Sequence, residues 1–241
     1  MQTMSADSQL IGDLVLANHI LYDQGVLDAA GHVSVRHDKR ADRFLLARSM
    51  APGSVAAGDI FEFDLEGSPI DPQAPRPYLE RFIHSEIYKA RPDVMSVVHS
   101  HSPAIVPYSI SRGQRLRAAC HMAGFIGEEA PLFEIRETAG PATDLLIGSP
   151  ALGRALAQTL GASNIVVMRG HGSTVTAPSL QLAVFRAYYA DVNARYQAQA
   201  IGMGLFTPLT AEESEACVKS VESQARRPWD LWAAEAVARR R

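Results

Sequence analysis

Residues 80–101 read ERFIHSEIYKARPDVMSVVHSH, and this stretch decides the fold. Apolar residues at helical spacing predict a helix from Leu79 to Ala90, with Glu80 in its first turn. Pro92 ends that helix, because the residue before a proline is pushed out of the helical region of backbone space. The short β-branched run that follows, from Ser96 to His101, predicts a buried strand.

Two histidines lie at the end of this predicted strand. Residues two apart on a strand share a face, so His99 and His101 point the same way. A third histidine, His171, lies between two glycines after the apolar strand predicted over 164–168. Three neutral imidazoles leave one position open on a tetrahedral metal, which is typical of catalytic sites. Histidines that merely pack in the core or lie on the surface are the alternative, and the shared pattern of strand ends disfavours it.

Composition and length set the class of protein. At 241 residues and 26.1 kDa the chain can bury one large core, which favours a single α/β domain. A net charge of -3 without a basic patch argues against nucleic acid as a partner. Two distant cysteines favour neither a disulfide scaffold nor a cysteine zinc site. Neither a signal peptide nor a membrane-spanning run is visible, so we expect a cytoplasmic protein with no membrane partner.

The remaining elements are expected to alternate along the chain. Gly25, Gly67 and Gly161 are placed at turns or helix ends, where glycine is favoured. Helices are expected over 8–24, 103–111, 151–160, 179–202 and 210–225 and around Trp229 and Trp232, and strands over 32–36, 43–47, 59–65, 115–119, 131–135 and 164–168.

The motifs in combination resemble the class II aldolase/adducin N-terminal family over about residues 14–204. They are Gly31-His-Val-Ser34, Glu80 eight residues before Tyr88, Arg91-Pro-Asp93, Val97-Val-His-Ser-His101 and Arg169-Gly-His-Gly172. The resemblance implies a three-layer α/β/α fold with a central, mainly antiparallel sheet. It also implies a single domain over 1–241, with a core of about 8–204 and C-terminal helices over 205–241. A homotetramer with active sites at subunit interfaces is a further implication.

The resemblance assigns roles to individual residues. His99, His101 and His171 would bind a divalent metal, for which zinc, manganese and iron are all suitable. Glu80 matches the family's catalytic carboxylate, an acid or base acting on the substrate. His121 falls where the sugar-phosphate aldolases carry an acid-donating tyrosine, so it is a candidate second acid. A structural histidine at the pocket edge is an equal alternative for His121.

The residues expected around the substrate depart from the aldolase pattern. The sugar-phosphate aldolases hold phosphate with an Asn, a Thr/Ser-Gly loop and a Ser-Ser pair. Here an imidazole, a guanidinium and two bulky side chains replace them, at His32, Arg48 and Tyr78-Leu79. Such groups suit a flat ring with a carboxylate better than a phosphate. The expected substrate-binding residues are Gly31, His32, Arg48, Ser49 and Tyr78.

These departures make the chain similar to the family's aromatic-acid decarboxylases, such as those acting on 3-hydroxy-2-methylpyridine-4,5-dicarboxylate. The resemblance implies a metal-dependent lyase of aromatic-compound catabolism that decarboxylates a hydroxylated aromatic or heteroaromatic acid or diacid. A metal acting as a Lewis acid would stabilise the charge that develops as the C–C bond breaks. One alternative is retro-aldol cleavage of a hydroxy-keto or sugar-phosphate substrate. A remoter one is a non-catalytic, adducin-like interaction domain, which usually lacks the ligand histidines.

Overall fold

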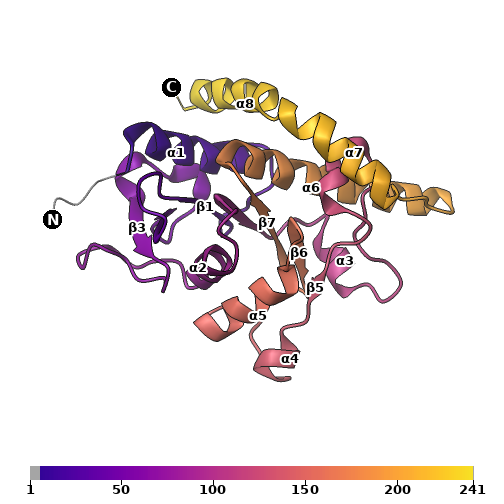
Figure 1. Ribbon diagram of the computed structural model, residues 1–241, viewed down its shortest axis with the longest axis horizontal. Helices are drawn as coiled ribbons and strands as arrows, with labels where there is room; N and C mark the ends of the chain where they lie inside the picture. The colour runs from indigo at the N-terminus through magenta and orange to yellow at the C-terminus, as the bar shows by residue number, and fades with distance from the viewer. Residues whose placement is uncertain (1–5, 241) are drawn as a thin grey trace.

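A seven-stranded sheet runs through the middle of the computed structural model, which describes residues 6–240 (Figure 1). The strand order is β3-β2-β1-β4-β7-β6-β5, and only the pairing of β5 with β6 is parallel within the described residues. The strands are β1 (His32–Arg36), β2 (Arg43–Ala47), β3 (Ile60–Asp64), β4 (Ser96–Ser100), β5 (Leu132–Phe133), β6 (Ile165–Met168) and β7 (Gly172–Ala177). The predicted mainly antiparallel sheet is confirmed.

Helices cover both faces of the sheet. Figure 1 shows α1, α6 and α8 on one side and α2 and α5 on the other, so the predicted three-layer α/β/α architecture is confirmed. The helices are α1 (Ser8–Asp23), α2 (Arg81–Ala90), α3 (Val106–Ile110), α4 (Arg136–Ala139), α5 (Pro150–Leu160), α6 (Leu180–Met203), α7 (Ala211–Val221) and α8 (Arg226–Ala238). Short 3-10 helices are η1 (Pro52–Ser54), η2 (Ala57–Asp59), η3 (His121–Ile126) and η4 (Glu222–Gln224). Within residues 6–240, none of these helices combines the length and apolar character needed to cross a membrane.

The apolar residues of each central strand divide between the two faces. On β4, Val98 packs with the α1 and α6 side, whereas Val97 packs with the α2 and α5 side. This division follows from the period of two along a strand. Trp229 and Trp232 of α8 are buried in the same cluster as Val98, so the C-terminal helix completes that layer.

Strand β7 is not among the strands predicted from the sequence. Its residues, Gly-Ser-Thr-Val-Thr-Ala, are small and largely polar, yet all of them are buried between β4 and β6. The Thr174 hydroxyl donates a hydrogen bond to Met168 Sδ at 3.4 Å. Because Thr174 lies directly opposite His99 in the ladder, β7 fixes the strand that carries the histidine pair.

The strand predicted over residues 115–119 is wrong, because this extended segment does not join the sheet. Its backbone bonds instead to two side-chain amides that lie one turn apart on α6. Asn193 accepts from the Ala119 N–H at 2.7 Å and donates to the Arg117 carbonyl at 2.8 Å. Gln197 accepts from the Arg117 N–H at 3.0 Å and donates to a further carbonyl of the segment at 2.7 Å. The two amides thus take the place of a neighbouring strand.

Helix α2 begins later than predicted. Leu79 was expected on its buried face, but this side chain lies before the helix and is 47% exposed. Glu80 occupies the N-cap position, with a non-helical ψ of 18°, and its side chain does not cap the helix. The carboxylate is therefore available to groups outside the helix.

Helix α5 holds α2 in place through a close contact at Gly153. A methyl group on Gly153 would lie 2.4 Å from the Phe82 carbonyl oxygen. We expect Gly153→Ala to destabilise the fold by about 1–3 kcal/mol, the usual cost of overpacking. Gly12→Ala in α1 is the matched control, because nothing lies within 4 Å of the added carbon; it should be neutral or stabilise by up to about 1 kcal/mol. Urea denaturation measures both, and equal stabilities would contradict a tight α2–α5 contact.

Candidate metal centre

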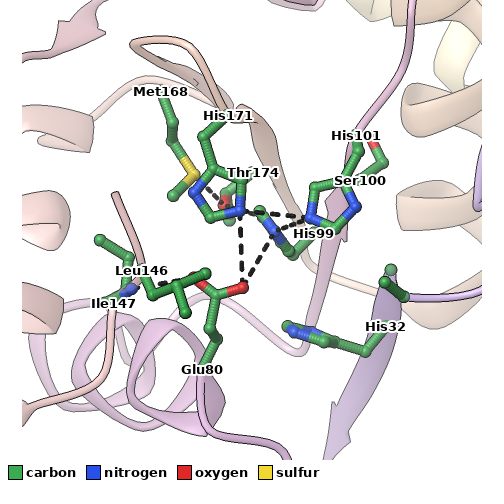
Figure 2. A network of polar contacts seen from close by, with 12 residues as sticks. His32, Glu80, His99, Ser100, His101, Leu146, Ile147, Met168, His171 and Thr174 are labelled. Carbon is green, nitrogen blue, oxygen red and sulfur yellow. Dashed lines mark hydrogen bonds and ion pairs between the residues drawn. The ribbon is translucent and has the colours of Figure 1, made fainter. Parts of the chain in front are cut away.

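Four side chains that could bind a metal meet at the end of β4. The nearest ligand atoms of Glu80, His99, His101 and His171 all lie within 4.8 Å of one another (Figure 2). His99 is on β4 and His101 follows it, whereas His171 lies in the turn between β6 and β7. The antiparallel pairing of β4 with β7 places that turn beside the end of β4. The structure thus brings together the four residues that the sequence singled out for metal binding and acid–base chemistry.

The three rings point their Nε2 atoms at a common centre. His101 Nε2 is 3.0 Å from His99 Nε2 and 3.2 Å from His171 Nε2. Two nitrogens bound at 2.0–2.1 Å to a tetrahedral ion lie about 3.3–3.4 Å apart. The observed separations therefore suit three ligands of one small divalent cation.

The Nδ1 partners show which ring nitrogen carries the proton in two of these histidines. His171 Nδ1 lies 2.9 Å from the Leu145 carbonyl oxygen, which can only accept, so Nδ1–H donates. His101 Nδ1 lies 3.2 Å from Asp28 Oδ2, again an acceptor. In both rings the lone pair is left on Nε2, as a metal ligand requires.

The third ring follows the same rule through a weaker contact. His99 Nδ1 lies 3.4 Å from Thr174 Oγ1, whose own hydrogen is directed to Met168. The hydroxyl therefore accepts from Nδ1–H. Three Nε2 lone pairs facing one another at these distances repel unless a cation lies between them. The donor set therefore fits a divalent metal on grounds of its own hydrogen bonding.

The Glu80 carboxylate completes the cluster. Its Oε1 accepts a hydrogen bond from the Ile147 N–H at 2.9 Å. Its Oε2 faces the centre, 3.5 Å from His171 Nε2 and 3.7 Å from His99 Nε2. Burial opposes ionisation, but the close approach of His171 and the field of the neighbouring His99 and His32 rings outweigh it and hold the pKa of the Glu80 carboxyl well below its usual range. Glu80 is thus an oriented carboxylate with one oxygen directed at the centre.

The loop before α5 supports the cluster through its backbone. Leu145 has a φ of 69°, the one positive value of a non-glycine residue within 6–240. Such a conformation costs about 1–3 kcal/mol and persists where the surroundings impose it. Here it directs the Leu145 carbonyl to His171, while the Ile147 N–H holds Glu80. Neither role depends on side-chain type, so no sequence signal could have found them. Asp28 was also missed, because it belongs to no recognised motif.

A cavity of about 310 Å³ opens beside Glu80. Three predicted substrate-binding side chains line it, those of His32, Ser49 and Tyr78. The His32 ring lies 4.7 Å from the Tyr78 ring and 5.0 Å from the His99 ring, measured between centroids. The rest of the lining is mostly apolar and comprises Ala29, Ala30, Met50, Ala51, Leu79 and Leu146.

The other predicted site residues take different positions. Gly31 passes so close to β4 that an added methyl group would lie 3.0 Å from the His99 carbonyl oxygen. Arg48 is not among the described residues that line the cavity. Its Nε donates a hydrogen bond to Asp59 Oδ1 at 2.7 Å. His121 is exposed at the start of η3 and lies outside the four-residue cluster. The roles of all three residues stay predictions.

Comparison with known proteins gives consistent results. The model of the Class II Aldolase and Adducin N-terminal domain matches residues 12–198. The chain is 38% identical over 240 residues to the decarboxylase tropJ of Talaromyces stipitatus, covering 90% of each protein. It is 30% identical over 214 residues to a 3,4-dihydroxyphthalate decarboxylase of Terrabacter sp., covering 83% of each. An L-fuculose 1-phosphate aldolase structure from Glaciozyma antarctica shares the fold, with a TM-score of 0.76 and 21% identity over 94% of this chain and 89% of that one.

Removal of one nitrogen ligand tests the metal centre. We expect His99→Ala and His171→Ala to fold but to bind the metal much more weakly. Loss of a residue that only hydrogen-bonds to a ligand costs roughly 10–100-fold in metal affinity, and loss of the ligand itself should cost more. His121→Ala is the control, since this residue lies outside the cluster, and should keep the metal. Elemental analysis of the purified proteins measures the metal per chain, and circular dichroism checks folding. Full metal content in both ligand variants would contradict the three-histidine site.

Proposed function

The chain belongs to the class II aldolase and adducin family, in its decarboxylase branch, and from this premise we propose that it is a divalent-metal-dependent decarboxylase of a hydroxylated aromatic or heteroaromatic acid. One observation carries the proposal. Three imidazole lone pairs and one oriented carboxylate converge beside a cavity whose walls suit a flat ring. Lyase chemistry of this kind needs a cation and a proton-transfer group next to the breaking bond.

The cavity favours a ring over a sugar phosphate. Leu79 lines it where a phosphate-binding aldolase would place a small donor. The Tyr78 hydroxyl is not free, because it donates to the Met50 carbonyl oxygen. At this side of the cavity a phosphate dianion would therefore meet the apolar Leu79 and a Tyr78 hydroxyl that is already used, which is costly. The tilted rings of Tyr78 and His32 instead offer aromatic contact.

The names of the relatives support an aromatic acid. The 3,4-dihydroxyphthalate decarboxylase of Terrabacter sp. acts on a benzene diacid that also carries hydroxyl groups. In such a compound, a hydroxyl and a carboxylate on neighbouring carbons can approach one cation together. We infer a substrate of this class for the present chain, with the second carboxylate optional.

The proposed chemistry assigns one task to each residue of the cluster. His99, His101 and His171 would hold the divalent metal, zinc or manganese or else iron, which supplies Lewis-acid stabilisation of negative charge on a substrate oxygen. Glu80 Oε2 takes the proton of the ring hydroxyl as the substrate binds. The same carboxyl then delivers the proton to the ring carbon that bears the carboxylate, and CO2 leaves as the electrons of the C–C bond return to the ring and its oxygen. The Ile147 N–H keeps Oε1 fixed throughout, so that Oε2 stays directed at the reacting atoms.

Further roles belong to the same proposal. Arg48 keeps guanidinium nitrogens that Asp59 does not use, and these would bind a second carboxylate at the cavity rim. Gly31 and Ser49 would contact the substrate through their loops. His121 can act as a second acid only if another copy of the chain supplies it, as in a homotetramer with interfacial sites. Cytoplasmic catabolism of aromatic compounds is the expected setting.

Two other functions compete with this one. A retro-aldol reaction would use the same metal and carboxylate on a hydroxy-keto substrate or a sugar phosphate. A non-catalytic interaction domain, as in adducin, would not need three converging lone pairs and an ionised Glu80. The intact cluster therefore favours an enzyme over the interaction domain.

A substrate panel separates the two enzyme functions. We expect ortho-hydroxy benzoates, dihydroxyphthalates or hydroxypyridine dicarboxylates to release CO2 in a reaction that chelators abolish and added metal restores. Fuculose and rhamnulose 1-phosphates should give no aldehyde, because Tyr78 and Leu79 offer no free donor where the aldolases bind phosphate. CO2 and aldehyde are measured in parallel on the same preparation. Efficient cleavage of a sugar phosphate without any decarboxylation would reverse this assignment.

Substitution of Glu80 tests the proton transfer. Glu80→Gln keeps the shape and the bond from Ile147 but cannot take a proton, so we expect full metal content and a loss in kcat of about two to four orders of magnitude. Glu86→Gln is the matched control. Glu86 lies on the same helix, is buried and pairs with Lys89 at 3.0 Å, away from the centre. A near-wild-type rate in Glu80→Gln would assign the proton transfer to another group.

A further inference from the structure

A chain of buried polar groups runs from the cavity into the core. His32 Nδ1 lies 2.7 Å from His84 Nε2, and His84 Nδ1 lies 2.6 Å from Ser34 Oγ. Ser34 Oγ in turn lies 2.8 Å from the Tyr88 hydroxyl. All four residues are at most 2% exposed. The first of them, His32, lines the cavity beside Glu80.

Two structural periods bring these groups together. His32 and Ser34 lie two apart on β1 and therefore share the face that packs on α2. His84 and Tyr88 lie four apart on α2 and share one side of that helix. The chain of hydrogen bonds thus joins the strand to the helix that carries Glu80 at its start.

The far end of the chain sets the direction of every bond in it. Burial raises the pKa of the Tyr88 phenol, so its proton stays in place. A backbone hydrogen bond at Val97 acts to lower that pKa and therefore comes from an N–H donor, so the phenol oxygen accepts there and its hydrogen is left for Ser34 Oγ, which accepts it. The Ser34 hydrogen then points to His84 Nδ1. A buried hydroxyl that donated to nothing would cost about 1–3 kcal/mol, which disfavours the reverse order.

The two imidazoles continue the same order. Burial lowers the pKa of His84 to about 3, so the ring is neutral and holds a single proton. Since Nδ1 accepts from Ser34, that proton is on Nε2, which donates to His32 Nδ1. His32 must then carry its own proton on Nε2, the nitrogen with no protein partner among the described residues.

We propose that His32 presents this Nε2–H to the substrate as a fixed donor, directed at an oxygen substituent of the aromatic ring, and that His84 is the positioning residue that sets the tautomer. The assignment rests on the proposed decarboxylase function. Negative charge spreads from the ring to its oxygen substituents while the bond to CO2 breaks. A preorganised donor at such an oxygen stabilises the transition state more than the ground state.

The role of these four hydrogen-bonded residues is more than packing. Apolar residues of similar volume would fill the space between β1 and α2 without the cost of burying four polar groups. Phe44, whose ring stacks on His84 at 6.3 Å between centroids, shows that this layer accepts aromatic residues. The four residues are nevertheless hydrogen-bonded at each link and leave only the His32 Nε2–H free within residues 6–240, at the cavity, as expected of groups that orient a functional side chain.

Nuclear magnetic resonance of the zinc-loaded enzyme, with 15N-labelled histidine, tests the tautomer directly. The His32 signals are identified by their absence in His32→Asn. We expect the proton on Nε2 in the wild type. His84→Phe removes both bonds of His84 and keeps ring volume, so His32 should become a mixture of tautomers. His84→Gln should restore the Nε2–H form, because its amide oxygen accepts from Ser34 and its NH2 donates to His32.

Kinetics on the acid that the enzyme decarboxylates give the second readout. His84→Phe should lower kcat by about 10–100-fold, a usual cost of losing a partner that orients a histidine. KM and metal content should change little, and His84→Gln should recover most of kcat. Tyr88→Phe removes the hydroxyl that sets the direction and should also mix the tautomers. If His84→Phe does not fold, the His32 tautomer measured in Tyr88→Phe tests the proposal instead.

The outcomes separate this proposal from the proposed function. A wild-type His32 protonated on Nδ1 would overturn the donor assignment, whatever the enzyme does to aromatic acids. Unchanged tautomer and kcat in His84→Phe would overturn the role of His84. If His32 carries Nε2–H but no aromatic acid is decarboxylated, the proposed function fails while the tautomer assignment stands.

Discussion

Three imidazole lone pairs directed at one point are the constraint on which the rest of this structure depends. Each ring holds its proton on Nδ1 because an acceptor lies there, and each Nε2 is thereby left for a cation. The acceptors come from three distant parts of the chain, namely Asp28, Leu145 and Thr174. The fold must keep all three in place, since one ring with the other tautomer would direct an N–H at the common centre instead of a lone pair.

That requirement explains features that cost stability. Strand β7 places buried hydroxyls in the centre of the sheet, where apolar side chains would normally be more favourable. Leu145 adopts a left-handed backbone conformation worth about 1–3 kcal/mol of strain. Both lie beside His171, and both serve its orientation or that of His99. The apolar layers on the two faces of the sheet offset such costs, and the tight α2–α5 contact keeps Glu80 in register with the rings.

Sequence patterns predicted those parts of the site that depend on periodicity and residue type. The spacing of His99 and His101, the helix after Glu80 and the three-layer architecture follow from such signals and from resemblance to the family. Strand β7 was not predicted, because small polar residues buried on both faces lack the alternation that marks a strand. The 115–119 segment was wrongly predicted as a strand of the sheet, because its hydrogen-bond partners are side-chain amides of α6, which no strand pattern encodes. Backbone roles such as those of Leu145 and Ile147 leave no trace in residue identity.

The four histidines around the centre show why residue type alone does not fix function. His99, His101 and His171 each face an acceptor at Nδ1, so each offers a lone pair to a cation. The His32 ring lies 5.0 Å from that of His99, yet its Nδ1 faces His84, which on the hydrogen-bond order inferred above is a donor. The same side chain then offers a hydrogen instead of a lone pair and is unsuited to be a fourth ligand. Under the proposed function, three histidines would hold the cation and His32 would provide a hydrogen-bond donor beside it for a substrate oxygen. The partner behind each ring, more than the ring itself, therefore decides which of these histidines offers a lone pair to the centre and which offers a hydrogen.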